Sequence, residues 1–144
     1  MKKLSLLPEL NIAFFSLLLN FTWEVLQTPF YVDRSTEINT IIWYRLHCTF
    51  GDVAITLGCF WLVSLIFKSR TWLFIPTKKK IQLFIAFGVS YTIFSEITNV
   101  RLVESWGYSG LMPVIPYIKV GIVPLLQWVF IPLVLIFIVR RQLS

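Results

Sequence analysis

The chain has 144 residues, of which 57% are hydrophobic and only 14% are charged, and its mean hydropathy is +0.77. Because a soluble domain needs about 25% charged residues to cover its surface, this composition excludes an ordinary soluble domain and predicts an all-α, polytopic membrane protein. The net charge of +6 does not indicate nucleic-acid binding, since no basic stripe interleaves with exposed aromatic residues.

Four apolar stretches are long enough to cross the membrane, since a helix needs about 20 residues to span roughly 30 Å of hydrocarbon. We expect transmembrane helices at about 10–31, 46–67, 81–100 and 118–139. Together they form a single transmembrane domain, residues 1–144. The first stretch follows Lys2 and Lys3, as the core of a signal peptide would. It lacks an A-x-A-like cleavage site and stays apolar too long, so we expect a retained helix.

Basic residues predict how these helices are oriented. Nine lie on the side of the two chain ends: Lys2, Lys3, Lys68, Arg70, Lys78, Lys79, Lys80, Arg140 and Arg141. Four lie on the other side: Arg34, Arg45, Arg101 and Lys119. Because cytoplasmic loops carry the excess of Lys and Arg, we expect a multi-pass protein with both termini in the cytoplasm.

Three carboxylates, Glu24, Asp52 and Glu96, lie inside these apolar segments. A carboxylate in hydrocarbon costs several kcal/mol unless it is neutral, paired or bound to a ligand, so the three residues form the candidate site. At a rise of about 1.5 Å per residue, all three and Gln127 fall in the outer half of the bilayer, roughly 7–12 Å deep. The sequence therefore predicts a polar chamber below the outer face and an apolar inner half.

In the first helix, Asn20, Glu24, Gln27 and Tyr31 follow one another at spacings of four, three and four, which places them on one face. Trp23 adjoins Glu24 and is predicted to contribute to an aromatic wall. The alternative is a polar stripe that joins helices, which would account for Asn20 and Gln27 more readily than for a carboxylate.

The second helix carries His47, Cys48 and Asp52. Adjacent helical residues point about 100° apart and chelate poorly, so we expect no metal site here, and His47 is expected to anchor the helix at the interface. Gly51 and Gly58 are expected to let another helix approach closely beside Asp52.

The third helix has the densest polar cluster, made of Thr92, Ser95, Glu96, Asn99 and Arg101. Arg101 is expected either to pair with a carboxylate of the chamber or to extend to the lipid headgroups, and the sequence favours neither.

The connection from residue 101 to 119 is aromatic and rich in helix breakers, and it contains Trp106 and Tyr108. It is predicted to fold over the chamber as a lid; the alternative is a belt segment at the headgroup level. In the fourth helix, Gln127 lies between Pro124 and Pro132, which are expected to bend the helix.

The chain resembles a functionally uncharacterised family of small bacterial four-helix integral membrane proteins. The matching stretches are residues 20–31 (NFTWEVLQTPFY), 47–52 (HCTFGD), 106–113 (WGYSGLMP) and 124–127 (PLLQ). The resemblance implies a four-helix, multi-pass fold in the bacterial inner membrane and brings no activity with it. The chain also loosely resembles lycopene cyclase domains and the sterol-isomerase-like membrane fold, with which it shares no motif. The similarity is that those proteins use buried carboxylates to protonate a carbon skeleton.

Three functions are consistent with this pattern. In the first, the chamber is an acid–base enzyme site for a lipid or isoprenoid-like apolar molecule, because three carboxylates in low dielectric cannot all ionise. Glu24 and Glu96 are then the acid–base pair, and Asp52 tunes their charge. The predicted substrate-binding residues are Asn20, Trp23, Gln27, Asn99, Arg101, Trp106, Tyr108 and Gln127.

The second function is a small proton- or cation-coupled transporter, which would need a cytoplasmic route and would suit a homo-oligomer. The third is an accessory protein that binds a partner helix. The expected partners are membrane lipid and an apolar small molecule, and the sequence identifies no cofactor.

Overall fold

The computed structural model describes residues 7–32 and 36–143, and their regular structure is helical apart from two short strands. The four α-helices of this part of the chain are α1 (Pro8–Leu26), α2 (Ile38–Ile66), α3 (Lys78–Glu96) and α4 (Ile122–Leu143). Within these described residues, α2, α3 with its extension to Leu102, and α4 are each long and apolar enough to cross a membrane. The predicted all-α class is therefore confirmed, and three of the helices could cross a membrane, as the prediction requires.

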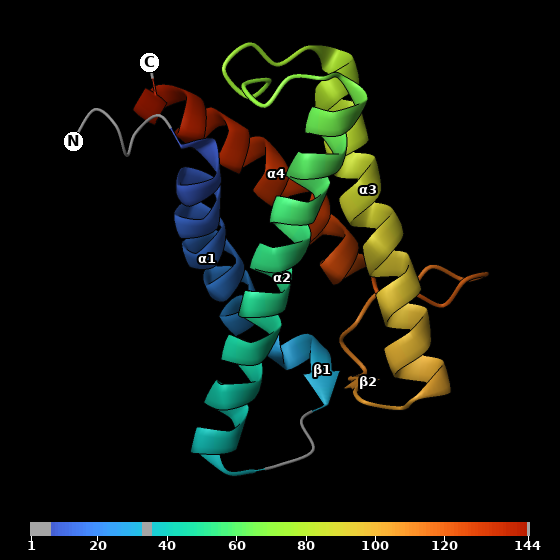
Figure 1. Cartoon of the computed structure of the whole chain (residues 1–144). Helices are drawn as coiled ribbons and strands as arrows, with labels where there is room; N and C mark the ends of the chain where they lie inside the picture. Colours follow the sequence, from blue (N-terminus) through green and yellow to red (C-terminus); the bar gives the residue numbers. More distant parts are fainter. Residues whose placement is uncertain (1–6, 33–35, 144) are drawn as a thin grey trace.

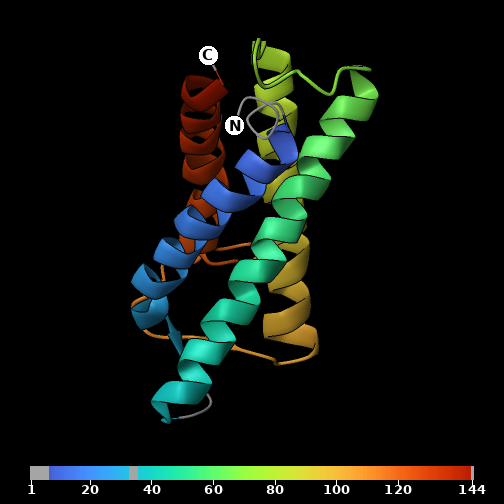
Figure 2. The same cartoon turned by 60° about the vertical axis from the view of Figure 1, so that its left-hand side comes forward.

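The helices run alternately up and down (Figure 1). The start of α1, the α2–α3 connection and the end of α4 lie at one end of the bundle, and the two strands lie at the other (Figures 1 and 2). At the first end, Arg70 donates two hydrogen bonds to Glu9, of 2.7 and 2.9 Å, and so ties the α2–α3 connection to α1. The basic residues of the α2–α3 connection and of the last turn of α4 therefore share one end of the molecule.

Two helix boundaries differ from the sequence prediction for physical reasons. Helix α2 begins at Ile38, eight residues before the predicted start, because apolar residues continue the helix beyond the hydrocarbon length, and Arg45 therefore lies inside it. Helix α4 begins at Ile122 and not at 118, since the backbone of Lys119 has a φ of 51°, which no right-handed helix accommodates.

The ends of α1 and α3 are also modified. Helix α1 stops at Leu26 and is followed by the 3₁₀ turn η1 (Thr28–Phe30), because the ring of Pro29 interrupts regular helix geometry. Helix α3 continues as the π-helix η2 (Ile97–Leu102), a wider form that is common near functional sites.

The half of the bundle near the α2–α3 connection has an apolar core. Trp72 of that connection is 1% exposed and lies between Phe60 of α2 and Phe84 of α3, with ring centroids 5.9 and 5.5 Å away. Further buried residues of this core are Ile12, Val63, Leu73, Leu135 and Val139. The predicted apolar half is thus a packed core.

Close approach between helices occurs at a different glycine from those predicted. A Cβ at Gly88 of α3 would lie 2.2 Å from Cε3 of Trp128, so the missing side chain is what lets this ring pack on α3. A Cβ at Gly51 or Gly58 would meet no atom within 4 Å. The expectation that these two glycines admit a neighbouring helix is therefore wrong within the described chain, because both lie on the exposed face of α2.

The long α3–α4 connection is fastened to the end of α1. Strands β1 (Tyr31–Val32) and β2 (Gly107–Tyr108) pair antiparallel, with Tyr31 opposite Tyr108. Ser109 adds two hydrogen bonds, from its N–H to the Phe30 carbonyl at 2.9 Å and from its hydroxyl to the Pro29 carbonyl at 2.7 Å. This pairing holds the connection against the bundle at the end opposite the apolar core.

Candidate functional site

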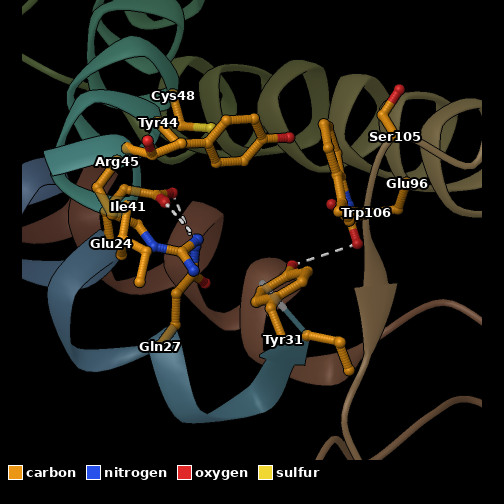
Figure 3. Close-up of a pocket in the computed structure, with 12 residues that line it drawn as sticks. Glu24, Gln27, Tyr31, Ile41, Tyr44, Arg45, Cys48, Glu96, Ser105 and Trp106 are labelled. Carbon is orange, nitrogen blue, oxygen red and sulfur yellow. Dashed lines mark hydrogen bonds and ion pairs between the residues drawn. The ribbon is translucent and has the colours of Figure 1, made fainter. Parts of the chain in front are cut away.

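A cavity of about 600 Å³ lies among the four helices, on the side of the bundle that carries the strands. The carboxylates Glu24, Asp52 and Glu96 all line it, and so does Gln127 of α4. A smaller pocket of about 120 Å³ adjoins it and shares Glu24 and Glu96 with it. The larger volume, about 600 Å³, falls in the range of small-molecule binding sites. Figure 3 shows Glu24, Gln27 and Arg45 on one side of the smaller pocket, facing Trp106 and Glu96 on the other.

Glu24 has a buried cation as its neighbour. Arg45 reaches from α2 and places Nη1 3.8 Å from Oε2 of Glu24, and both side chains are less than one-tenth exposed. The side chain of Gln27, one turn further along α1, donates a 2.7 Å hydrogen bond to Oε1. The face predicted for α1 therefore does point inward, and Arg45 supplies the positive charge that compensates Glu24.

Glu96 accepts hydrogen bonds from two phenols of the paired strands, and Figure 3 shows the one from Tyr31. The hydroxyl of Tyr108 donates to Oε2 at 2.6 Å and that of Tyr31 donates to the same oxygen at 3.2 Å. Burial, followed by the nearby Glu96 charge, raises the pKa of Tyr31, and burial together with the hydrogen bond to Glu96 raises the pKa of Tyr108. Both phenols therefore stay neutral and remain donors. The indole nitrogen of Trp106 is also near, although outside hydrogen-bonding geometry.

Asp52 is positioned by an amide network. The Gln127 side-chain nitrogen donates to Oδ2 of Asp52 and to Oδ1 of Asn20, both at 2.9 Å. Asn20 in turn donates to the hydroxyl and carbonyl oxygens of Ser16, each at 2.9 Å. Asn20 and Gln127 therefore fix the carboxyl group of Asp52 from α1 and α4, and Asn20 itself does not line the cavity.

The remaining predicted residues divide between the cavity and the outside. Asn99 and Trp106 line the cavity, and Asn99 is held by a 2.9 Å hydrogen bond to the Ser95 carbonyl. Arg101 is exposed and Trp23 is half-buried, and neither lines the cavity. The cation beside the carboxylates is Arg45 and not Arg101, since the longer α2 carries Arg45 inward while Arg101 faces out from η2.

His47 and Cys48 also line the cavity. Within residues 7–32 and 36–143, no group of three His, Cys, Asp or Glu side chains is placed to hold a metal ion. The described side chains of the site offer carboxyl groups, phenols, amides, one guanidinium, one imidazole and one thiol.

Among the lining residues that sequence reasoning did not assign to the site are Arg45, Tyr31, Tyr44 and Thr92. For Tyr31 a signal existed, because it completes the spacing that begins at Asn20. For Arg45 and Tyr44 the signal was hidden, because both precede the predicted start of their helix.

Comparison with protein-family models, curated proteins and solved structures found no match to this chain. The functional argument therefore rests on the residues of the site.

Proposed function

We propose that this chain is a four-span protein of the bacterial inner membrane with both termini in the cytoplasm, and that its cavity performs acid–base chemistry on a lipid or isoprenoid-like molecule. In this topology α1, which has 19 residues, also crosses the membrane and brings the number of spans to four. The concentration of basic residues at the end of the bundle that carries the α2–α3 connection supports the orientation. The cavity then lies toward the outer face.

One observation supports the enzymatic proposal: three carboxyl groups line one cavity, and their immediate surroundings differ. Among the described residues, Glu24 has an amide donor and the Arg45 guanidinium nearby, Glu96 has two phenol donors, and Asp52 has an amide donor without a nearby cation. A set of carboxyl groups in unlike surroundings is what an enzyme needs in order to hold an acid and a base at the same pH.

These partners also suggest how the roles divide. A nearby guanidinium stabilises Glu24 as a carboxylate, and two phenols do the same for Glu96. Within the described residues, the Asp52 carboxyl group accepts one hydrogen bond, and its donor is the neutral amide of Gln127. We therefore assign Asp52 as the proton donor, Glu96 as the proton acceptor and Glu24 as the balancing charge. This assignment differs from the sequence-based one, in which Glu24 and Glu96 were the acid–base pair and Asp52 tuned their charge. The sequence analysis did not place Arg45 beside Glu24.

Transport is the weaker alternative. A transporter needs access from both sides of the membrane, and in the described chain the half of the bundle beyond the cavity is filled by Phe60, Trp72 and Phe84. An enzyme that takes its substrate from the membrane needs only the access that the cavity itself provides.

Solvent deuterium provides a direct test. The purified protein is reconstituted with total bacterial lipid extract in D₂O, and the lipids are extracted, returned to H₂O and analysed by mass spectrometry. Proton transfer to carbon leaves one deuterium that does not exchange back. We expect incorporation with wild type, and its loss in Asp52→Asn and Glu96→Gln. Glu104→Gln removes one negative charge from an exposed residue, and this control variant should still incorporate deuterium. Equal deuterium content in wild type and Asp52→Asn would refute the proposal.

A further inference from the structure

The polar groups of the larger cavity are mostly hydrogen-bond acceptors that still have free capacity. The indole nitrogen of Trp106 is an unpaired donor in the lining, and besides the three carboxyl groups two buried oxygens also have no partner: Oε1 of Gln27 and the hydroxyl of Thr92. Each of these two side chains is only 5% exposed, and each lines the cavity. Because an unpaired buried polar group costs about 1–3 kcal/mol, these atoms indicate a ligand that carries donors.

The charge of the cavity points the same way. No Lys or Arg is among the described residues that line the larger cavity, whereas three carboxyl groups are. Arg45 lines the adjoining smaller pocket, where it compensates Glu24. Asp52 and Glu96 have only neutral donors as hydrogen-bond partners, so a positively charged ligand would complete the site electrostatically.

The size and walls of the cavity favour an organic cation over a metal ion. Within the described residues no three potential ligands are grouped closely enough for a metal, and a volume of about 600 Å³ far exceeds what one ion fills. The lining includes the aromatic rings of Tyr44, Tyr91, Trp106 and Trp128. Aromatic faces attract ammonium groups, and separated acceptors suit the three N–H donors of a primary ammonium.

The cavity also has an opening for an apolar tail. Gly51 of α2 and Tyr91 of α3 both line it, and both are exposed on the surface of the bundle. No atom lies within 4 Å of where a Gly51 side chain would begin. In a membrane, an alkyl chain can therefore pass between α2 and α3 into the hydrocarbon while its polar end stays inside.

We propose that the cavity binds a protonated primary amine carried by an apolar molecule, with Glu96 as the counter-charge and Asp52, Gln27 and Thr92 as further acceptors. The ammonium group has two natural sources, the headgroup of a membrane aminolipid or a free long-chain amine. The inference rests on the proposed function in that it takes the same cavity as the substrate site and names the substrate class. It is tested by binding alone, so it can fail or succeed independently of the deuterium experiment.

The experiment compares dodecylamine with its N-acetyl derivative, which has the same chain and no charge. Wild-type protein in phosphatidylcholine nanodiscs is titrated with each, and quenching of tryptophan fluorescence is recorded, with empty nanodiscs correcting for partitioning. We expect saturable binding of the amine, at least tenfold tighter than binding of the acetyl compound. Equal binding of the two compounds would overturn the inference, and this comparison needs no variant to fold.

Two variants then locate the site, after circular dichroism has shown that their helix content is unchanged. Glu96→Gln should weaken amine binding at least tenfold, and Glu104→Gln should leave it unchanged. Amine binding that is equally strong in wild type and Glu96→Gln would reject this cavity. Adding phosphatidylethanolamine to the nanodiscs distinguishes the two sources of the ammonium group. If this lipid competes with dodecylamine, the ligand is an aminolipid; if it does not compete, the ligand is a free long-chain amine.

Discussion

The packing of Trp128 on Gly88 provides the most direct test of the bundle that shapes the cavity. Trp128 is 4% exposed and also lines the cavity, so its position links helix packing to the site. In Gly88→Ala the new Cβ would lie 2.2 Å from Cε3 of the indole, whereas ordinary van der Waals contact begins near 3.4 Å. The ring or the helix must therefore retreat by about 1.2 Å.

The expected cost follows from the tightness of this contact. Inserting a methyl group into a filled core typically costs about 1–3 kcal/mol, because side chains leave their preferred rotamers or the backbone shifts. The gain in helix propensity from Gly to Ala, about 1 kcal/mol in water, offsets part of this. Gly58→Ala is the matched control, since a Cβ there meets nothing within 4 Å and only the propensity gain applies.

Unfolding in detergent micelles, followed by circular dichroism, measures both changes without relying on tryptophan emission. We expect the free energy of unfolding of Gly88→Ala to fall by about 1–3 kcal/mol. That of Gly58→Ala should stay constant or rise. Combining Gly88→Ala with Trp128→Leu should recover most of the loss, because the smaller side chain vacates the contested space. If Gly88→Ala and Gly58→Ala proved equally stable, the close packing of α3 on α4 described here would be wrong.

Three further predictions concern the site and its orientation. Arg45→Gln should lower the free energy of unfolding by about 3–5 kcal/mol, since it leaves Glu24 buried without its cation, and adding Glu24→Gln should restore much of it. The raised pKa of Tyr108 predicts that its phenol contributes stability below about pH 10, the ordinary tyrosine value, and that this contribution declines as the pH rises toward the folded-state pKa. Tyr108→Phe should therefore flatten the alkaline loss of stability, and an unchanged pH profile would refute this. In a cysteine-free background, a membrane-impermeant thiol reagent added to intact cells should label Tyr117→Cys and not Lys79→Cys, and the reverse pattern would invert the topology.

The general location of the site could be predicted because a buried charge is costly. Glu24, Asp52 and Glu96 are conspicuous in apolar sequence, and the same cost that marks them also drives them toward one another and away from lipid. The spacing of Asn20, Glu24 and Gln27 on one helical face needed no tertiary information. These features are local, so the sequence alone contained them.

Arg45 could not be assigned because its role depends on helix length. An arginine before an apolar run ordinarily marks the membrane boundary, but α2 has 29 residues and is about 43 Å long, well beyond the roughly 30 Å of hydrocarbon. The helix continues past the boundary, and Arg45 turns inward to Glu24. Likewise, the pairing of Tyr31 with Tyr108 joins residues far apart in the chain, and neither segment alone indicates its partner.

The glycines show a different limit. Gly51, Gly58 and Gly88 all lie within predicted helices, and composition gave no reason to prefer one as the close-packing position. What separates them is the neighbour: Gly88 faces the broad ring of Trp128, whereas the other two face outward from α2. The side of a membrane helix that packs cannot be read from hydropathy, because lipid-facing and protein-facing positions are both apolar.

The division of the bundle into an apolar half and a polar half has a consequence for how any ligand reaches the site. Polar side chains inside a membrane are tolerated only where partners satisfy them, and here the ladder from Ser16 through Asn20 to Gln127 ends at Asp52 and the cavity. Beyond it, the rings of Phe60 and Trp72 fill the bundle. A ligand or a proton therefore gains access from the strand-bearing end or from between α2 and α3. This arrangement suits a site that selects molecules already dissolved in the membrane.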